Sequence, residues 1–239
     1  MQENRLAFDA LILAGGRSSR LGGVPKQSLV FQGQTLLERA IAAAEGARHT
    51  VVVGDAGSLP DGALAAGLLR PPTWPSRLLM CREEPPFAGP AAAIAAGLDA
   101  LARNGEEAPY SLVLACDMPL ASLAVTALRD ALAQSAAAGG GGDGVIACAQ
   151  DGRVQPLAGL YGTAGLTKAC RNLASRNALV NGSVRALLAS LDVQLVTVPA
   201  GSTSDVDTWD DAAALGVAAG KQRVCQDRQA GGDNVGGKS

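Results

Sequence analysis

The chain has 239 residues, a formal net charge of −2, 48% hydrophobic residues and only 3% aromatic ones. This length fits one α/β unit whose core must be built from Ala, Val, Leu and Ile. The small net charge gives no support for a nucleic-acid or membrane partner, so any anion-binding site must be local.

Apolar, strand-like runs alternate with helix-like segments, which predicts an α/β fold with a mostly parallel sheet covered by helices. The predicted strands are residues 8–14, 50–53, 78–81, 110–116, 145–149, 157–161 and 193–198. The predicted helices are residues 35–45, 89–102, 123–137, 166–174, 183–190 and 207–219. Thr35 is the expected N-cap of the first helix, with Glu38 in capping-box position. We expect a single domain over residues 1–219, with an irregular excursion at 59–76, a flexible glycine linker at 136–144 and a disordered tail over 220–239.

The loop after the first strand combines two glycine pairs with three basic residues and no acidic one. These residues are Gly15, Gly16, Gly22, Gly23, Arg17, Arg20 and Lys26. Glycines let backbone amides approach an anion closely, and the basic side chains add fixed positive charge. Ligands in open α/β sheets bind at such strand ends, so we predict a polyphosphate site. It is not a Walker loop, which needs Gly-Lys-Ser/Thr, nor a dinucleotide fingerprint, whose glycine spacing differs.

A second candidate site lies at the exit of the predicted strand 110–116, where Asp117 is followed by Met118 and Pro119. A carboxylate there can hold a divalent ion over the first loop. Mg²⁺ takes carboxylate and phosphate oxygens and neutralises the negative charge of a bound polyphosphate. The alternative is that Asp117 caps the following helix. We expect Cys116 to be a core residue.

The five cysteines are widely spaced and form no Cys-x-x-Cys pair, which argues against a zinc site or a disulfide framework. We find no basic-plus-apolar leader and no apolar run long enough to cross a bilayer, so we expect a cytoplasmic protein. His49 is the single histidine and opens a predicted strand, which favours a structural role.

The pattern Ala-Gly-Gly-x-Ser-x-Arg-Leu-Gly-Gly-x-x-Lys over residues 14–26 resembles the signature of the nucleotidyltransferases. Within them it looks most like the molybdenum cofactor guanylyltransferases, and the resemblance covers roughly residues 8–215. It implies a Rossmann-like, three-layer α/β/α fold. It also implies Mg²⁺-dependent transfer of GMP from GTP to the molybdenum-pterin cofactor with release of pyrophosphate, and handover partners for cofactor insertion.

The resemblance also implies roles for individual residues. Arg20 and Lys26 would hold the β- and γ-phosphates, and Cys-Asp-x-Pro carries the metal role onto Asp117; these three are the expected catalytic residues. The nucleotide-binding residues implied are Leu13, Ala14, Gly15, Gly16, Arg20, Lys26, Gly54, Glu84 and Asp117.

A second metal carboxylate is implied in the segment before the last helix, as in related nucleotidyltransferases. Asp205 or Asp207 can supply it, and we favour Asp205. Asp207 or Thr208 can instead cap the helix. Trp209 replaces a proline that is common in relatives.

Three further segments resemble the family less closely. Either Glu83 or Glu84 is the counterpart of an acidic residue that precedes Gly-Pro and usually is Asp. Gly54 stands where some relatives have a nucleotide-contacting asparagine. Gln155-Pro156-Leu157 resembles an element on the acceptor side.

Alternative functions also follow from the sequence. The guanylyltransferases usually have Asp before the loop lysine, where this chain has Pro25. Pro-Lys-Gln resembles the cytidylyltransferase of isoprenoid precursor synthesis and the sugar-phosphate nucleotidyltransferases, and a cytidylyltransferase for the pterin cofactor is a further relative. A nucleotide-binding regulator without catalysis is the alternative outside the enzymes.

Overall fold

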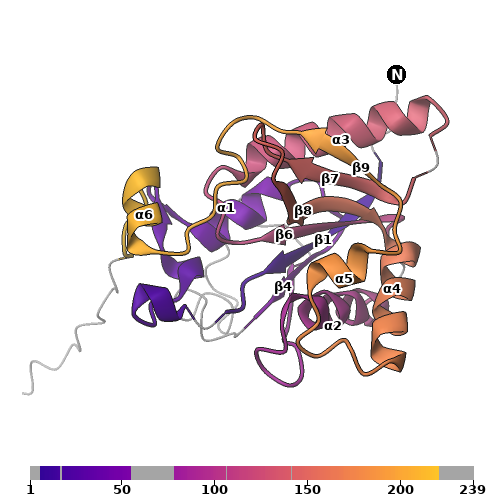
Figure 1. Ribbon diagram of the computed structural model, residues 1–239, viewed down its shortest axis with the longest axis horizontal. Helices are drawn as coiled ribbons and strands as arrows, with labels where there is room; N and C mark the ends of the chain where they lie inside the picture. The colour runs from indigo at the N-terminus through magenta and orange to yellow at the C-terminus, as the bar shows by residue number, and fades with distance from the viewer. Residues whose placement is uncertain (1–5, 17, 55–77, 106, 141, 221–239) are drawn as a thin grey trace, which may run out of the picture.

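The protein is described here from a computed structural model that covers residues 6–16, 18–54, 78–105, 107–140 and 142–220 (Figure 1). Arg17, the excursion expected at 59–76 and residues 221–239 of the expected tail lie outside the described residues.

A seven-stranded sheet with the order β5-β4-β1-β6-β8-β7-β9 forms the centre of the molecule. Its strands are β1 (Phe8–Leu13), β4 (Thr50–Val53), β5 (Leu78–Cys81), β6 (Tyr110–Ala115), β7 (Gly144–Cys148), β8 (Val154–Gly162) and β9 (Val193–Thr197). All pairings in this sheet are parallel except those of β8, which runs antiparallel to β6 and β7. The mostly parallel sheet predicted from the sequence is therefore confirmed.

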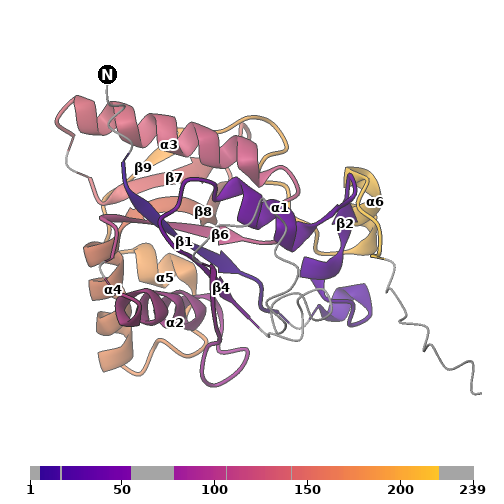
Figure 2. The ribbon, with the colours of Figure 1, turned by 180° about the vertical axis from the view of Figure 1, so that it is seen from behind.

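Helices cover both faces of the sheet, so the fold has three layers (Figures 1 and 2). The helices of the layers are α1 (Leu36–Ala43), α2 (Pro90–Arg103), α3 (Ala121–Ala137), α4 (Thr163–Ser175) and α5 (Val184–Leu188). One face packs on α1 and α3, the other on α2, α4 and α5. Strand β1 is buried throughout because its alternating side chains enter both cores: Ala10 and Ile12 face one, Leu11 and Leu13 the other.

Besides the two cores on the faces of the sheet, the molecule has a small third unit with a core of its own, which lies beyond the carboxyl ends of the central strands (Figure 2). It consists of the 3₁₀ helices η1 (Ser19–Leu21) and η2 (Lys26–Ser28), the hairpin of β2 (Val30–Phe31) and β3 (Gln34–Thr35), and helix α6 (Trp209–Leu215). Its core is formed by Leu21, Leu29, Phe31, Leu36, Val206, Ala212 and Val217. The first glycine loop is thus packed against a segment that comes almost 200 residues later in the chain.

Helix α6 is shorter than the predicted span 207–219. Thr208 caps it in a capping box with Asp211, so it begins at Trp209. Gly216 ends it in the left-handed conformation, at φ 72°, and Ala218 then forms a bridge with Val30. The capping box predicted for Thr35 and Glu38 at the start of α1 is confirmed.

His49 lies at the amino end of β4, where the structural role predicted for it can be followed in its contacts. Its backbone N–H donates to the buried Asp9 carboxylate at 3.0 Å, and its Nδ1 lies 3.2 Å from the same oxygen. Asp9 also accepts the N–H of Ala108 at 2.7 Å. One carboxylate therefore connects three segments at the end of the sheet opposite the glycine loop. No helix of the described residues is long and apolar enough to span a membrane.

Candidate functional site

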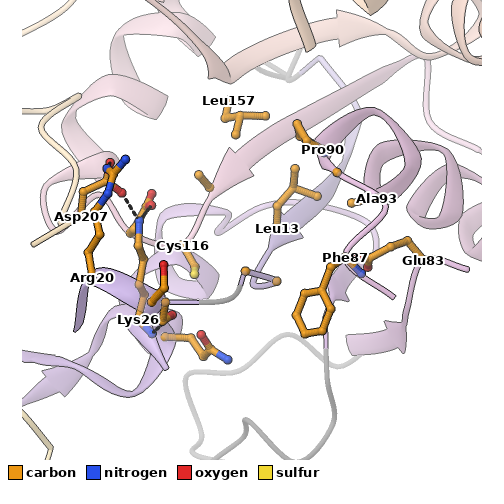
Figure 3. A pocket seen from close by; sticks show the side chains of 18 residues that line it. Leu13, Arg20, Lys26, Glu83, Phe87, Pro90, Ala93, Cys116, Leu157 and Asp207 are labelled. Atoms are coloured by element: carbon orange, nitrogen blue, oxygen red, sulfur yellow. Dashed lines mark hydrogen bonds and ion pairs between the residues drawn. The ribbon is translucent and has the colours of Figure 1, made fainter. Parts of the chain in front are cut away.

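A cavity of about 520 Å³ opens at the carboxyl ends of β1 and β6 (Figure 3). Its lining includes six of the residues predicted from the sequence: Leu13, Gly15, Gly16, Arg20, Lys26 and Asp117. Leu157, which we expected on the acceptor side, also lines it. The structure thus brings the glycine loop and the exit of β6 into one site.

Lys26 is the centre of the polar half of this cavity. Its Nζ donates to Oδ2 of Asp117 at 2.8 Å and to Oδ1 of Asp207. The more exposed Arg20 lies 3.5 Å from Oδ2 of Asp207. Burial alone would lower the pKa of Lys26, but the negative charge of Asp117 and the hydrogen bonds that the ammonium donates to both carboxylates outweigh it and raise this pKa. Lys26 is therefore a fixed ammonium across the physiological pH range.

The loop that carries Lys26 is anchored on both sides by buried leucines. Leu21 and Leu29 are almost fully buried in the third unit. Between them, Gly22 and Gly23 take φ values of 65° and 85°, which favour glycine over any residue with a Cβ. This arrangement holds Lys26 over the strand ends while leaving the Gly15–Gly16 backbone open to the cavity.

Asp117 is placed by the end of β6. The N–H of Cys116 donates to the carbonyl of Leu13 at 3.1 Å, and the N–H of Val206 donates to the carbonyl of Asp117 at 3.0 Å. Helix α3 begins only at Ala121 and has no side-chain cap, so the alternative of Asp117 as its N-cap is wrong. The Asp117 carboxylate points instead toward Lys26.

Asp117, Asp205 and Asp207 form an acidic group in which one carboxylate oxygen of each residue lies within 4.8 Å of the others. Neighbouring atoms partly exclude water from the Asp205 carboxylate, and the negative charge of Asp117 lies close to it. Both effects raise the pKa of Asp205. Oxygen donors at this spacing fit a hard divalent cation. Because Thr208 caps α6, Asp207 is free to face Lys26, and both candidates for the second carboxylate lie in the group.

A smaller cavity of about 120 Å³ adjoins the first on the other side of Gly15 and Gly16. Ala14 and Gly54, both predicted to contact the nucleotide, line it. A Cβ at Gly54 would lie 3.0 Å from the carbonyl carbon and oxygen of Ala14. The backbone after β4 and that of the loop thus lie close together, and a side chain at position 54 would require one of them to shift by a few tenths of an ångström.

Of the two candidate acidic residues in this region, Glu83 and Glu84, only Glu83 lines the cavities. Glu83 is buried, lines both cavities and accepts the N–H of Phe87 at 3.1 Å. Glu84 is exposed and belongs to the lining of neither cavity. The contact between Glu84 and the nucleotide stays a prediction, and Glu83 is the one of the two that is buried beside the cavities.

Two site features were not predicted from the sequence. Phe87 lines both cavities, and Asp207 joins Lys26 and Arg20 to the segment before α6. Cys116 lines the larger cavity but is buried, and burial together with the charge of Asp117 raises its pKa, so it is a neutral thiol.

Comparison with known proteins gives the family. Residues 10–196 match the family described as the MobA-like NTP transferase domain, which is more than half of the chain. The chain belongs to the MobA-like NTP transferase family.

Several relatives carry the name molybdenum cofactor guanylyltransferase. The protein of Bordetella petrii is 36% identical over 110 residues, which are 46% of this chain and 48% of that protein. The protein of Bordetella pertussis is 36% identical over 158 residues, 62% of this chain and 66% of that protein. The chain therefore spans about half to two thirds of the length of these MobA-like relatives.

Solved structures share the fold. The molybdopterin-guanine dinucleotide biosynthesis protein A of Archaeoglobus fulgidus has a TM-score of 0.57 at 19% identity, with 87% of this chain and 96% of that chain covered. The 2-C-methyl-D-erythritol 4-phosphate cytidylyltransferase of Francisella tularensis has a TM-score of 0.63 at 14% identity, with 88% and 98% covered. A Mycobacterium tuberculosis protein solved in complex with manganese has a TM-score of 0.52 at 20% identity, with 87% and 97% covered. The predicted Rossmann-like, three-layer nucleotidyltransferase fold is confirmed.

Proposed function

We propose that this chain transfers GMP from GTP to the phosphate of the molybdenum-pterin cofactor and releases pyrophosphate. The observation that carries the proposal is the meeting of Lys26, Asp117 and Asp207 beside the Gly15–Gly16 backbone, in a member of the MobA-like family. The names of the relatives support the choice of nucleotide and acceptor.

In this proposal the basic residues of the larger cavity bind the triphosphate. Arg20 and Lys26 would hold the β- and γ-phosphates and stabilise the departing pyrophosphate, the role that fixed cations have in phosphoryl transfer. Lys26 must then exchange its carboxylate partners for phosphate oxygens. Attack by the acceptor phosphate needs no covalent intermediate, so positioning and electrostatics suffice.

Asp117, with Asp205 or Asp207, would hold a divalent ion, which we propose to be Mg²⁺. When bound, this ion neutralises the negative charge that gathers on the phosphates. The acidic group supports this choice because its oxygens suit a hard cation, and the manganese complex of a protein with the same fold agrees with divalent-metal use.

Cytidylyl transfer is the second candidate. Pro25 precedes the loop lysine here, and several structural neighbours are cytidylyltransferases, although at 13–18% identity they share only the fold. The test is calorimetric titration of the full chain with GTP, CTP, UTP and ATP, each with Mg²⁺. Preference for GTP, followed by pyrophosphate release on addition of the pterin acceptor, supports the proposal; preference for CTP contradicts it. Binding of GTP without pyrophosphate release would indicate a nucleotide-binding regulator that has no catalytic activity.

A cytoplasmic location, handover partners for the finished cofactor and a single domain ending near residue 219 belong to the same proposal. The free thiols of the described cysteines, Cys81, Cys116, Cys148 and Cys170, agree with a reducing compartment.

A further inference from the structure

Phe87 combines three properties that set it apart from the other residues of the site. Its side chain is 51% exposed although aromatic residues make up only 3% of the chain. It is the single aromatic residue among the described residues that line the two cavities. Its φ of 60° lies in the left-handed region, which a bulky side chain rarely adopts. Such an outlier points to a role for the residue, because the surrounding structure must hold it there.

The loop around Phe87 is held from two sides. The N–H of Phe87 donates to the buried carboxylate of Glu83 at 3.1 Å. The carbonyl of the next residue, Ala88, accepts the N–H of Asn181 at 2.6 Å. Asn181 belongs to the loop between α4 and α5, so Phe87 is clamped between its own loop and a second one. The backbone from which the aromatic ring projects is therefore held by hydrogen bonds on both sides.

The direction of the nucleotide follows from the two ends of the site. Arg20, Lys26 and Asp207 lie on one side of the larger cavity, and Glu83 and Phe87 lie on the other (Figure 3). If the triphosphate is held at the basic end, the nucleoside must extend past Gly15 and Gly16. That path leads into the smaller cavity, which is lined by Gly15, Gly16, Gly54, Glu83 and Phe87. Glycine backbone and one flat ring suit a planar group.

We propose that Phe87 stacks on the nucleobase and favours a purine, because a purine offers a larger ring surface than a pyrimidine. The inference rests on the proposed function for the orientation of the triphosphate, and it adds a base-binding residue to it. Aromatic stacking on a base changes affinity by about tenfold or more when the ring is removed, and it tolerates any flat aromatic replacement.

The test is calorimetric titration of the full-length chain with Mg²⁺–GTP, Mg²⁺–CTP and Mg²⁺–tripolyphosphate. Phe87→Leu keeps an apolar side chain without a flat ring, and Phe87→Tyr keeps the ring. Phe87→Gly accepts the left-handed φ and removes the ring, so it serves if the leucine variant does not fold. Leu195→Ala is the matched control, because Leu195 is 55% exposed on the edge strand β9 and lines neither cavity.

We expect Phe87→Leu and Phe87→Gly to weaken GTP binding about tenfold and CTP binding less, while Phe87→Tyr and Leu195→Ala stay within about twofold of the parent. Tripolyphosphate, which has no base, should bind equally to all variants. Unchanged GTP affinity in Phe87→Leu, or equal losses for GTP and tripolyphosphate, would overturn the inference. A parent chain that prefers CTP instead overturns the proposed function and the purine preference, and the leucine–tyrosine contrast on CTP then decides whether Phe87 stacks at all.

Discussion

At the scale of single residues, Lys26 controls the charge of the site. It is the shared hydrogen-bond donor to Asp117 and Asp207, which lie 91 and 181 positions away in the chain. Both Lys26 and Asp117 were predicted from local motifs. Lys26 ends the glycine loop after the first strand, and Asp117 directly follows the predicted strand 110–116. Their pairing with Asp207 could not be predicted, since it depends on how the last helix returns to the first loop.

Removal of either charged group should abolish most of the activity. We expect Lys26→Ala and Asp117→Ala each to lower turnover by at least about a hundredfold, because preorganised electrostatic contacts to the reacting phosphates are worth that much. Pyrophosphate release with GTP and the pterin acceptor measures this. Arg153→Ala is the control, because Arg153 forms an exposed ion pair with Asp151 and lines neither cavity. Near-normal turnover in either site variant would remove that residue from the mechanism.

Lys26 should also limit metal binding before the nucleotide arrives. Its ammonium pairs with Asp117 and Asp207, two of the three carboxylates that would hold a divalent ion. Two positive charges a few ångströms apart repel each other by about 1 kcal/mol or more even at a hydrated site. We therefore expect Lys26→Met to bind Mn²⁺, in the absence of nucleotide, about tenfold more tightly than the parent.

Titration followed by the paramagnetic relaxation of water protons measures this affinity. Lys168→Met, which removes an exposed lysine on α4, should leave it unchanged. Equal or weaker Mn²⁺ binding in Lys26→Met would mean that the acidic group is not the metal site.

At the scale of elements, the accuracy of prediction followed the strength of the local signal. Strands β4 and β5 have the predicted bounds because each is a compact apolar run, ended by Gly54 in one case and flanked by Arg77 and Arg82 in the other. The hairpin of β2 and β3 was missed because two-residue strands carry no periodicity. Helix α6 was predicted too long, because its end depends on Gly216 and on the tertiary bridge between Val30 and Ala218.

The start of α6 links helix stability to the site. Asp211 accepts the N–H groups of both Thr208 and Asp207, and Thr208 Oγ1 accepts the N–H of Asp211. Hydrogen bonds from Thr208 lower the pKa of Asp211. The ionised Asp211 therefore stabilises the folded protein fully above the usual pKa of an aspartate, and this stabilisation is lost as the pH falls through the lowered value. The same cap therefore fixes the backbone of Asp207, the partner of Lys26.

We expect Thr208→Ala to lower the free energy of unfolding by about 1 kcal/mol, as loss of an N-cap does, and also to lower turnover several-fold. Thr35→Ala removes an equivalent capping box from α1 and is the matched control. It should cost similar stability with unchanged turnover. Urea unfolding and pyrophosphate release measure the two effects, and equal turnover in both variants would show that the cap does not position Asp207.

At the scale of the whole molecule, a buried polar group that stabilises the fold lies at one end of the sheet, and the candidate site lies at the other. The carboxylate of Asp9 is buried near the amino end of β1, while Leu13 at the other end of the same strand lines the larger cavity. Four residues of extended strand place these two positions about 13 Å apart. The sequence predicted the site at the carboxyl end of the sheet, because ligands of α/β folds bind at the carboxyl ends of strands. It did not predict the partners of Asp9, because a single aspartate in an apolar strand does not indicate which groups it binds.

This separation predicts that Asp9→Ala destabilises the protein without altering its activity. The substitution leaves the buried N–H groups of His49 and Ala108 without their acceptor, at a cost of about 3 kcal/mol in the free energy of unfolding. Below the unfolding transition, kcat and KM for GTP should stay within about twofold of the parent, because no group of the cavity has moved. Lys26→Ala should instead lose most of its turnover under conditions in which the protein is still folded. If Asp9→Ala lowers kcat while the protein remains folded, the two ends of the sheet are coupled, and the position of the glycine loop depends on the amino end of β1.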